Sequence, residues 1–258
     1  MQPRDRVNRA FSRAASSYEQ SAVVQKEVAS RLVSLLPDRL VLEQVYEFGC
    51  GTGLLTRALE ERCHITHWHI NDLSSVMLEQ LPPLGDKKPF LWVGDAEEVT
   101  PYHLLNSFDL IASASTLQWF SDPLGYLSKI FPMLKDVGMI LFSTFGERNL
   151  YELRMLTGRG LDYISMEEIG DFMHRHFYEV TLFEEQIPLA FPNLLTLFRH
   201  LKETGVTQLL KNNTPSLLTS REALEQLEIR YRELYWHSDG GLSLTYHPIY
   251  VKASLPKR

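Results

Sequence analysis

Residues 47–53 read EFGCGTG, and this stretch decides the fold. A short apolar run, residues 45–48, leads into it, and a helical pattern over residues 54–61 follows it. Glycines at alternate positions let the backbone turn tightly and approach a ligand closely. Glycine-rich turns between a strand and a helix also occur without a ligand, but three alternate glycines in this context favour a ligand-binding loop. The sequence therefore predicts a nucleotide-type site at the end of a β-strand.

Strand and helix patterns alternate around this loop. A helical pattern over residues 14–36 precedes it and ends before Pro37, which cannot continue a helix. The expected strands cover residues 45–48, 66–70, 90–93, 108–112 and 138–144, and the expected helices cover residues 54–61, 74–81 and 123–134. This alternation is typical of an α/β fold, in which helices cover both faces of a mostly parallel sheet.

The second half of the chain is richer in helical patterns. We expect helices at residues 150–156, 165–177, 192–204 and 219–235, and strands at residues 180–187 and 242–253. Ser165 and Glu168 have the spacing of a helix capping box. The helices between the last two strands resemble an insertion, and such insertions usually cover a site. No linker rich in proline or glycine divides the chain. We therefore expect one domain over residues 1–258, with an N-terminal helical segment at 1–37 and cap segments at about 147–176 and 192–236.

The composition excludes several classes of protein. Of 258 residues, 44% are hydrophobic and 22% are charged, as in ordinary globular domains. No stretch approaches the ~20 consecutive apolar residues of a membrane-spanning helix. Two cysteines cannot form a disulfide scaffold, which fits a reducing cytoplasm. The net charge of -6 argues against a protein that coats nucleic acid.

The start of the chain is basic in spite of this net charge. Arg4, Arg6, Arg9 and Arg13 stand there against Asp5 alone. An organellar presequence, the solvated face of a helix and a surface for an acidic partner all have this composition. Composition does not choose among them.

Acidic residues at the ends of three expected strands indicate which ligand the loop binds. Glu47 lies two positions before the first glycine, where it would repel a phosphate and suit a cation such as an amino group. Asp72 ends the second strand ~20 residues on, where a ribose is bound in such folds. Asp95, beside Ala96, follows the third strand and suits an adenine amino group. A ligand with a ribose, an adenine and an ammonium group but no phosphate is S-adenosylmethionine.

At these residues the chain resembles the class I S-adenosylmethionine-dependent methyltransferases. The segments EFGCGTG (47–53), NDLSSVML (71–78), GDAEEV (94–99) and FDLIASASTLQWFSDP (108–123) occur in the order and spacing of that family. The resemblance implies a Rossmann-like sheet that is mostly parallel, with an antiparallel last strand. It also implies a cofactor site made of Glu47, Gly49, Cys50, Gly51, Gly53, Asp72, Leu73, Asp95, Ala96 and Ser113.

Further segments are similar to the family of malonyl-acyl-carrier-protein O-methyltransferases of biotin synthesis. They are FSRAASSYEQSAVVQ (11–25), STLQW (115–119), FSTFGERNLYELR (142–154), LFRHLKETGV (197–206) and LTYHPIYVKA (244–253). The resemblance runs from about residue 6 to residue 253, so the arginine-rich start leads into a family helix and a removable presequence is disfavoured. The turn FGER (145–148) departs from the Gly-Pro-Gly type of turn common in the family. Ubiquinone-type and trans-aconitate-type methyltransferases share the core and the Leu-Gln-Trp segment. The alternatives are therefore a methyltransferase for another small carboxylic acid or a quinone precursor, and a catalytically silent binding domain.

The resemblance implies methyl transfer from S-adenosylmethionine to the free carboxylate of a malonyl group on acyl carrier protein, which gives the methyl ester for pimeloyl and biotin synthesis. A carboxyl group with a pKa near ~4 is already ionised at neutral pH, so no general base is needed. The protein must align one oxygen with the methyl group and exclude water. The candidates for placing the carboxylate are Tyr18, Gln118, Trp119, Arg148 and Arg154. We expect catalytic roles for Tyr18, Gln118, Trp119 and Arg154, with the Arg154 guanidinium on the carboxylate. Packing, or a surface ion pair for the arginines, is the competing interpretation.

Two groups of histidines, His64, His67 and His69 and then His174 and His176, raise the question of a metal. No cysteine or acid completes a zinc set and the reaction needs no metal, so we expect none.

The resemblance also implies an acidic acyl carrier protein as partner, or malonyl-CoA in its place, and neither nucleic acid nor membrane. We expect a basic docking surface for the carrier protein. It is formed either by Arg4, Arg6, Arg9 and Arg13 or by Arg199, Lys202 and Lys211. An ordinary solvated surface is the alternative for both groups.

Overall fold

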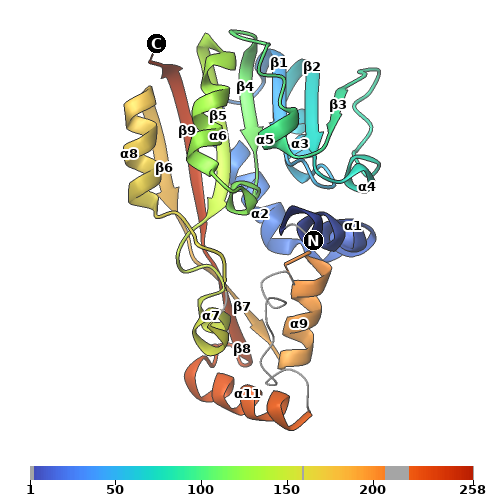
Figure 1. Cartoon of the computed structure of the whole chain (residues 1–258), viewed down its shortest axis with the longest axis vertical. Coiled ribbons are helices and arrows are strands. Elements are labelled where there is room, and N and C mark those ends of the chain that lie inside the picture. Colours follow the sequence, from blue (N-terminus) through green and yellow to red (C-terminus); the bar gives the residue numbers. More distant parts are fainter. Residues whose placement is uncertain (1–2, 159, 207–220, 258) are drawn as a thin grey trace.

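A seven-stranded sheet in the order β3-β2-β1-β4-β5-β9-β6 forms the upper half of the molecule (Figure 1). This computed structural model describes residues 3–158, 160–206 and 221–257. Strands β1 to β5 run parallel, whereas β9 pairs antiparallel with both β5 and β6. The sheet confirms the predicted Rossmann-like class with an antiparallel last strand. The strands are β1 (Leu40–Phe48), β2 (Cys63–Asp72), β3 (Phe90–Val93), β4 (Phe108–Ser113), β5 (Leu134–Phe145), β6 (Phe177–Glu184) and β9 (Pro248–Pro256).

The strand order reverses direction at β1, and this places the site. From β1 the chain adds β2 and β3 on one side and then β4 and β5 on the other. In open α/β sheets a ligand binds in the crevice outside the carboxyl ends of the strands at such a switch point. Because β1 to β4 are parallel, the loops that follow them all lie at this one edge.

Both faces of the sheet are covered by helices. Val45 packs into an apolar cluster on one face, whereas Tyr46 and Phe48 pack into a cluster on the other, as side chains of a strand alternate. The helices and 3₁₀ turns between the strands are α3 (Leu54–Arg62), α4 (Ser75–Leu78), α5 (Ala96–Val99), η1 (Leu117–Trp119), α6 (Pro123–Ile130) and η2 (Phe131–Met133). No described helix is both long enough and apolar enough to cross a lipid bilayer.

The helix predicted over residues 14–36 is two helices, α1 (Pro3–Ser21) and α2 (Val23–Val33). They meet at Ala22, which is completely buried and has a non-helical ψ of 47°. Helix α2 packs against α3, whereas α1 crosses to α4 and α9, so the chain must turn between them. Periodicity misses this break because no proline or glycine marks it.

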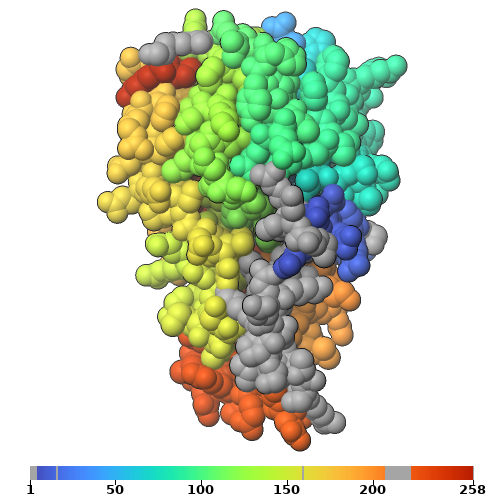
Figure 2. All heavy atoms as spheres, viewed as in Figure 1, coloured from blue at the N-terminus to red at the C-terminus, as the bar shows by residue number. Residues whose placement is uncertain are grey.

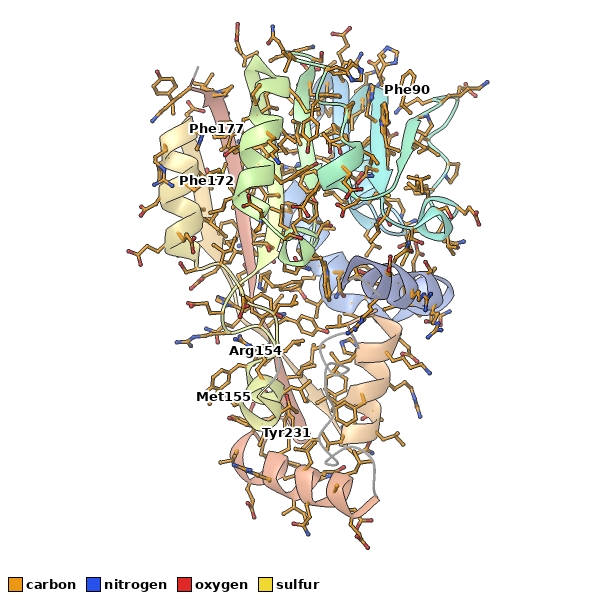
Figure 3. All side chains as sticks on the ribbon, viewed as in Figure 1. Phe90, Arg154, Met155, Phe172, Phe177 and Tyr231 are labelled. Atoms are coloured by element: carbon orange, nitrogen blue, oxygen red, sulfur yellow. The ribbon has the colours of Figure 1, made fainter. Side chains whose placement is uncertain are left out.

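Helix α8 (Met166–His176) belongs to the sheet and not to the lower part of the molecule. The Phe131 ring lies 5.8 Å from the ring of Phe172 and 4.8 Å from that of Phe177, which begins β6. Figure 3 shows Phe172 and Phe177 beside the large sheet. The Ser165 side chain caps the helix by accepting from the Glu168 backbone N–H at 3.1 Å, as its spacing predicted. The expected cap segment 147–176 therefore includes one helix that lies elsewhere.

A smaller layer lies below the carboxyl edge of the seven-stranded sheet. It contains a two-stranded antiparallel sheet, β7 (Ile187–Phe191) with β8 (Leu242–Tyr246), and the helices α7 (Tyr151–Thr157), α9 (Leu194–Glu203) and α11 (Arg221–Leu234). The predicted strands 180–187 and 242–253 are each divided between the two sheets, which the sequence pattern did not show. Polar residues at 184–186 and at 247 lie at these divisions, but tertiary pairing decides which part joins which sheet. We refer to this layer as the cap.

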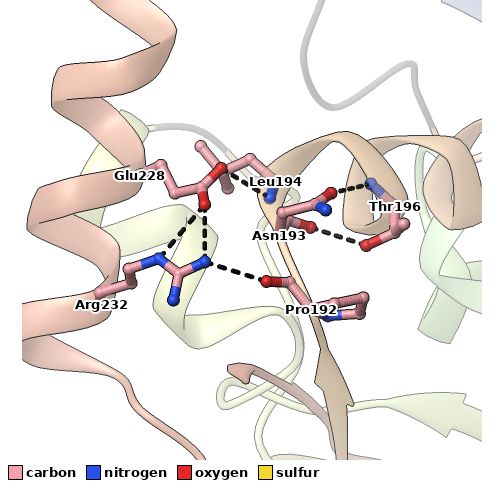
Figure 4. A network of polar contacts seen from close by, with 6 residues as sticks. All are labelled: Pro192, Asn193, Leu194, Thr196, Glu228 and Arg232. Carbon is pink, nitrogen blue, oxygen red and sulfur yellow. Dashed lines mark hydrogen bonds and ion pairs between the residues drawn. The ribbon is translucent and has the colours of Figure 1, made fainter. Parts of the chain in front are cut away.

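Polar contacts join α11 to the start of α9 within the cap (Figure 4). The Glu228 carboxylate accepts from the Leu194 backbone N–H at 3.2 Å and from Arg232 at 2.8 Å. Arg232 also donates to the carbonyl of Pro192 at 3.0 Å. Asn193 caps α9 by accepting from the Thr196 N–H at 2.9 Å. These contacts satisfy backbone groups at the helix start that have no partner inside the helix.

Candidate active site

A pocket lies between α1 and the carboxyl ends of β1, β2 and β4. We call it the first pocket. The predicted cofactor residues that line it are Glu47, Gly49, Cys50, Gly51, Asp72, Leu73, Asp95 and Ala96. These residues come from the ends of β1, β2 and β3, which the parallel arrangement brings to one edge, and Ala114, Ser115 and Thr116 after β4 also line the pocket.

The glycine loop depends on glycine for two different reasons. Gly49, Gly51 and Gly53 have φ angles of +64°, +57° and +84°, a region that side chains disfavour. A Cβ on Gly49 would also lie 2.2 Å from the Thr116 side chain, and one on Gly53 would lie 2.5 Å from Pro82. At Gly51 nothing lies within 4 Å, so its open side faces the pocket. Gly53 shapes the turn into α3 without lining the pocket.

Asp72 holds the glycine loop in place and still faces the pocket. Its carboxylate accepts from the backbone N–H groups of Gly51 and Ser74, both at 2.8 Å. Burial raises the pKa of Asp72 to about 6, although these two hydrogen bonds lower it. Each carboxylate oxygen has a second lone pair, which can accept from a ligand hydroxyl.

Glu47 is almost completely buried at the end of β1, with 1% of its surface exposed. Its carboxylate accepts from the Thr56 hydroxyl at 2.7 Å. Burial raises the pKa of Glu47 to about 8, and repulsion from Asp72 adds to this shift. No lysine or arginine is among the described residues that line this pocket. Two buried acids in such a pocket fit a ligand that brings its own positive charge, as the ammonium and sulfonium groups of S-adenosylmethionine do.

The remaining predicted cofactor residues have distinct positions. Asp95 lines the pocket and caps α5 by accepting from the Glu97 N–H at 2.9 Å. Ser113 does not line the pocket, because it is fully buried and its hydroxyl donates to the Phe48 carbonyl at 2.8 Å. This bond ties β4 to β1 directly below the glycine loop. Burial raises the pKa of the Cys50 thiol well above its usual value, which disfavours the thiolate form that a nucleophile needs.

Helix α1 covers the first pocket, a contribution that the sequence indicated only through Tyr18. Val7, Asn8 and Phe11 line the pocket beside Tyr18. Three polar contacts hold the helix there: the Ser12 and Ser74 hydroxyls at 2.8 Å, the Arg57–Glu19 ion pair, and a bond from Ser21 to Glu203 at 2.8 Å. Figure 2 shows α1, in dark blue, between the sheet and α9. The spacing of Val7, Phe11 and Tyr18 on one helical face was the available signal.

A second pocket adjoins the first and extends toward the cap. The two share Phe11, Tyr18, Gln25, Ser115 and Trp119. The Phe11 ring lies 6.3 Å from that of Tyr18 and 5.6 Å from that of Trp119, so three aromatic rings form the shared wall. Beyond this wall the second pocket is lined by Gln118, Phe145, Asn149, Leu150, Leu161, Tyr163, Thr204, Val206 and Tyr246.

Three of the four predicted catalytic residues meet at this second pocket. Tyr18 and Trp119 line both pockets, and Gln118 lines the second. Burial, with Asp72 nearby, raises the pKa of Tyr18, so its phenol stays protonated and can donate a hydrogen bond. Both ends of the Gln118 amide are engaged: it donates to the Ser115 carbonyl at 2.6 Å and accepts from the Thr144 hydroxyl at 3.4 Å.

The structure does not bring Arg154 or Arg148 to either pocket. Arg154 lies on α7, below the sheet (Figure 3). Its guanidinium donates to the Glu147 carbonyl and covers the Tyr163 ring at 5.1 Å. Tyr163 in turn lines the second pocket, so Arg154 packs against a pocket-lining residue without reaching the pocket itself. The sequence pattern placed Arg154 near the site but could not show which way its side chain points.

The described residues contain no group of three or more histidine, cysteine, aspartate or glutamate side chains placed to hold a metal. His69, from the first histidine group, stacks on Phe90 of β3 with ring centroids 4.8 Å apart.

Comparisons with known proteins agree with this architecture. Residues 46–142 match the sequence model of the family described as methyltransferase domain. The YcgJ protein of Bacillus subtilis has a TM-score of 0.58 at 14% identity, over 90% of this chain and 99% of its own. Phosphoethanolamine N-methyltransferase 2 of Haemonchus contortus, solved with S-adenosyl-L-methionine, has a TM-score of 0.57 at 17% identity, over 98% of this chain and 60% of its own. At such identities the likeness establishes the fold. The fold, the matched domain and the pocket together define a class I S-adenosylmethionine-dependent methyltransferase.

Relatives with higher identity narrow this class. Proteins named malonyl-acyl-carrier-protein O-methyltransferase share 36% identity in Porphyromonas gingivalis (96% of this chain, 94% of the relative) and 35% in Bacteroides thetaiotaomicron (96% of each). The protein of that name in Haemophilus influenzae shares 32% identity over 97% of this chain and 94% of its own. The chain belongs to the family of malonyl-acyl-carrier-protein O-methyltransferases.

Proposed function

We propose that this protein transfers the methyl group of S-adenosylmethionine to the free carboxylate of a malonyl group carried by acyl carrier protein. The observation that supports this most directly is similarity over the whole chain. The three relatives of that name described above align with 96% or 97% of it, far beyond the common methyltransferase core at residues 46–142. The segments outside this core include α1 and the cap, which line the second pocket.

The two pockets have the chemistry that this reaction needs. S-adenosylmethionine supplies a methyl group on a sulfonium, and when a carboxylate oxygen bonds to this carbon the carbon–sulfur bond breaks and sulfur keeps the electron pair. No proton moves, so the site needs no general base, and we assign none. Glu47 holds the ammonium group, Asp72 the ribose hydroxyls, and Asp95 with Ala96 the adenine edge. Phe11, Tyr18 and Trp119 exclude water where the two pockets meet.

The malonyl group reaches the second pocket on the flexible arm of the carrier protein. Arg9 and Arg13 are exposed on α1, and Arg199 and Lys202 are exposed on α9, so both helices present basic residues to an acidic partner. The side chain of Arg4 and all of Lys211, which belong to the two expected surfaces, lie outside the described residues. Malonyl-CoA carries the same arm without the carrier protein and is the alternative substrate. We place the reaction in the cytoplasm and expect it to need no metal.

Side-by-side methylation assays test the proposal. We expect transfer of labelled methyl from S-adenosylmethionine to malonyl-carrier protein, and little transfer to trans-aconitate or a polyprenyl phenol. The gene should also restore growth of a biotin-requiring strain that lacks this methylation step. Binding of S-adenosylmethionine without transfer to any of these acceptors would contradict the proposal and favour a silent binding domain.

A further inference from the structure

Two buried polar atoms without a partner lie in the wall that both pockets share. They are Oε1 of Gln25 and Oγ of Ser115. Buried polar groups in native proteins are nearly always hydrogen-bonded, so an unpartnered one at a pocket indicates a ligand. Gln25 and Ser115 come from α2 and from the turn after β4, and both residues line both pockets. The boundary between the two pockets, which both residues line, is where a methyl donor and an acceptor would touch.

The backbone of Ser115 is held in an unfavourable conformation. Its φ is +54°, in the left-handed region that a residue with a side chain rarely adopts. Three hydrogen bonds hold it there: its N–H donates to the carbonyl and the hydroxyl of Ser143, both at 3.1 Å, and its carbonyl accepts from Gln118 at 2.6 Å. Such strain persists only where the surrounding structure enforces it, and it concentrates at functional sites. Here it leaves the hydroxyl without a protein partner at the pocket wall.

Gln25 is a polar residue on a helix face that is otherwise apolar. It is only 6% exposed, and its neighbours Val24 and Val28 are completely buried. A leucine would satisfy packing alone at such a position, whereas a buried amide costs free energy unless it is paired. Rotation about its last bond lets the carboxamide present either its N–H groups or its oxygen to a ligand.

We infer that the Ser115 hydroxyl and the Gln25 carboxamide bind the carboxylate of the acyl substrate, by donating to the oxygen that is not methylated. This inference rests on the proposed function. The other oxygen then points across the shared wall, and its lone pair forms the new bond to the methyl carbon. Tyr18, in the same wall, is a third neutral donor. Gln118 acts through its bond to the Ser115 carbonyl and is a positioning residue.

Neutral donors suit this reaction better than an arginine. The carboxylate loses its negative charge as it becomes an ester, so a cation beside it would stabilise the ground state more than the transition state. Among the described residues, no lysine or arginine lines either pocket. Neutral hydrogen bonds orient the carboxylate with less of this penalty. The inference therefore assigns to Ser115 and Gln25 the role that the sequence suggested for Arg154.

A binding comparison isolates the carboxylate contact. With S-adenosylhomocysteine bound, calorimetry measures the dissociation constants of malonyl-pantetheine and of isovaleryl-pantetheine, in which two methyl groups replace the carboxylate oxygens. Wild-type protein should prefer the malonyl ligand. We expect Ser115→Gly and Gln25→Leu each to reduce this preference by about tenfold or more, and kcat/KM with malonyl-carrier protein by a similar factor. Ser115→Gly removes the hydroxyl but eases the left-handed backbone, so loss of folding does not explain the effect.

Two matched variants serve as controls. Gln44 has a buried, unpartnered Oε1 like that of Gln25, but it lies within β1 and lines neither pocket, and Ser107 is remote from both. Gln44→Leu and Ser107→Ala should keep the wild-type preference. Both Ser115→Gly and Gln25→Leu could instead keep a preference for the malonyl ligand within twofold of wild type, while wild-type protein methylates malonyl-carrier protein. That result overturns the inference but leaves the proposed function intact. Failure of wild-type protein to methylate malonyl-carrier overturns the proposed function instead.

Discussion

Glu47 and Asp72 are carboxyl groups that the fold buries side by side at one ligand site. The pKa of Glu47 is raised to about 8 and that of Asp72 to about 6, chiefly by burial. An unfolded carboxyl group titrates near ~4, so the folded protein binds more protons than the unfolded one between these values. Stability of the ligand-free protein should therefore fall as pH rises from about 4 to about 8. A bound cation removes part of this cost by favouring the charged carboxylates.

The same raised pKa values predict how cofactor affinity depends on pH. In the proposed site the Glu47 carboxylate holds the ligand ammonium, so affinity for S-adenosylhomocysteine should fall more than about tenfold from pH 8 to pH 6.5. In Glu47→Gln the affinity should be weaker at pH 8 and change less than about twofold over this range. Calorimetry in buffers of different ionisation enthalpy measures both the affinity and the proton released. A flat wild-type profile would show that Glu47 is already ionised without ligand.

At the scale of single residues, the sequence correctly predicted which acidic residues lie together, because these acids are at strand ends. Glu47 lies near the end of β1, Asp72 ends β2 and Asp95 follows β3, so their meeting at one edge follows from the parallel sheet. Ser113 and Arg154 also lie near strand ends or turns, yet one side chain bonds to Phe48 and the other lies on Tyr163. The direction of a side chain depends on its neighbours in space, which a single sequence does not list.

At the scale of elements, two positions in the glycine loop distinguish the cost of backbone strain from the cost of a side-chain collision. Gly49 and Gly51 have φ angles of +64° and +57°, so an alanine at either position meets similar strain. Only at Gly49 would the new Cβ also collide with Thr116. The two positions are therefore matched probes of the loop.

We expect Gly51→Ala to cost about 1–2 kcal/mol of stability from the left-handed backbone alone. Gly49→Ala should cost clearly more and abolish measurable binding of S-adenosylhomocysteine, because Thr116 and the turn after β4 must move. Thermal unfolding and calorimetry on both variants measure this difference. Equal losses of melting temperature in the two variants would contradict the role given to crowding.

Element boundaries show where sequence patterns lose information. The strand–loop–helix units around β1 to β5 were predicted, because apolar runs and turn residues mark them locally. The break between α1 and α2 and the division of strands between the two sheets were not. Between α1 and α2 the apolar pattern continues, and at the strand divisions only a few polar residues interrupt it. The chain turns at these places because its two parts pack against different partners.

At the scale of the whole molecule, α1 is both the cover of the pockets and a candidate docking surface. Phe11 and Tyr18 face the pockets, whereas Arg9 and Arg13 are exposed, on the opposite side of the helix by its 3.6-residue period. Helix α9, which packs against α1, presents Arg199 and Lys202 to solvent.

Charge reversal distinguishes these two surfaces. Arg9→Glu with Arg13→Glu should lower kcat/KM for malonyl-carrier protein about tenfold or more at low salt, because an acidic partner loses its steering and contacts. The same variant should methylate malonyl-CoA within about twofold of wild type. Arg199→Glu with Lys202→Glu is the matched control with an equal change of charge. Loss in that control alone would move the docking surface to α9, and equal losses on both substrates would indicate general destabilisation.

The sequence by itself determined the class of fold, the glycine loop and the acids that line the first pocket. Each of these depends on a short stretch of sequence, a strand end and the turn that follows it. Parallel strands bring such ends to one edge of the sheet. Only the tertiary structure decided that Phe11 and Gln25 reach this edge, that Ser115 lines both pockets with its hydroxyl unpartnered, and that Arg154 stays outside. These positions depend on how α1, α2 and the cap pack against the sheet, and that packing joins segments far apart in the chain.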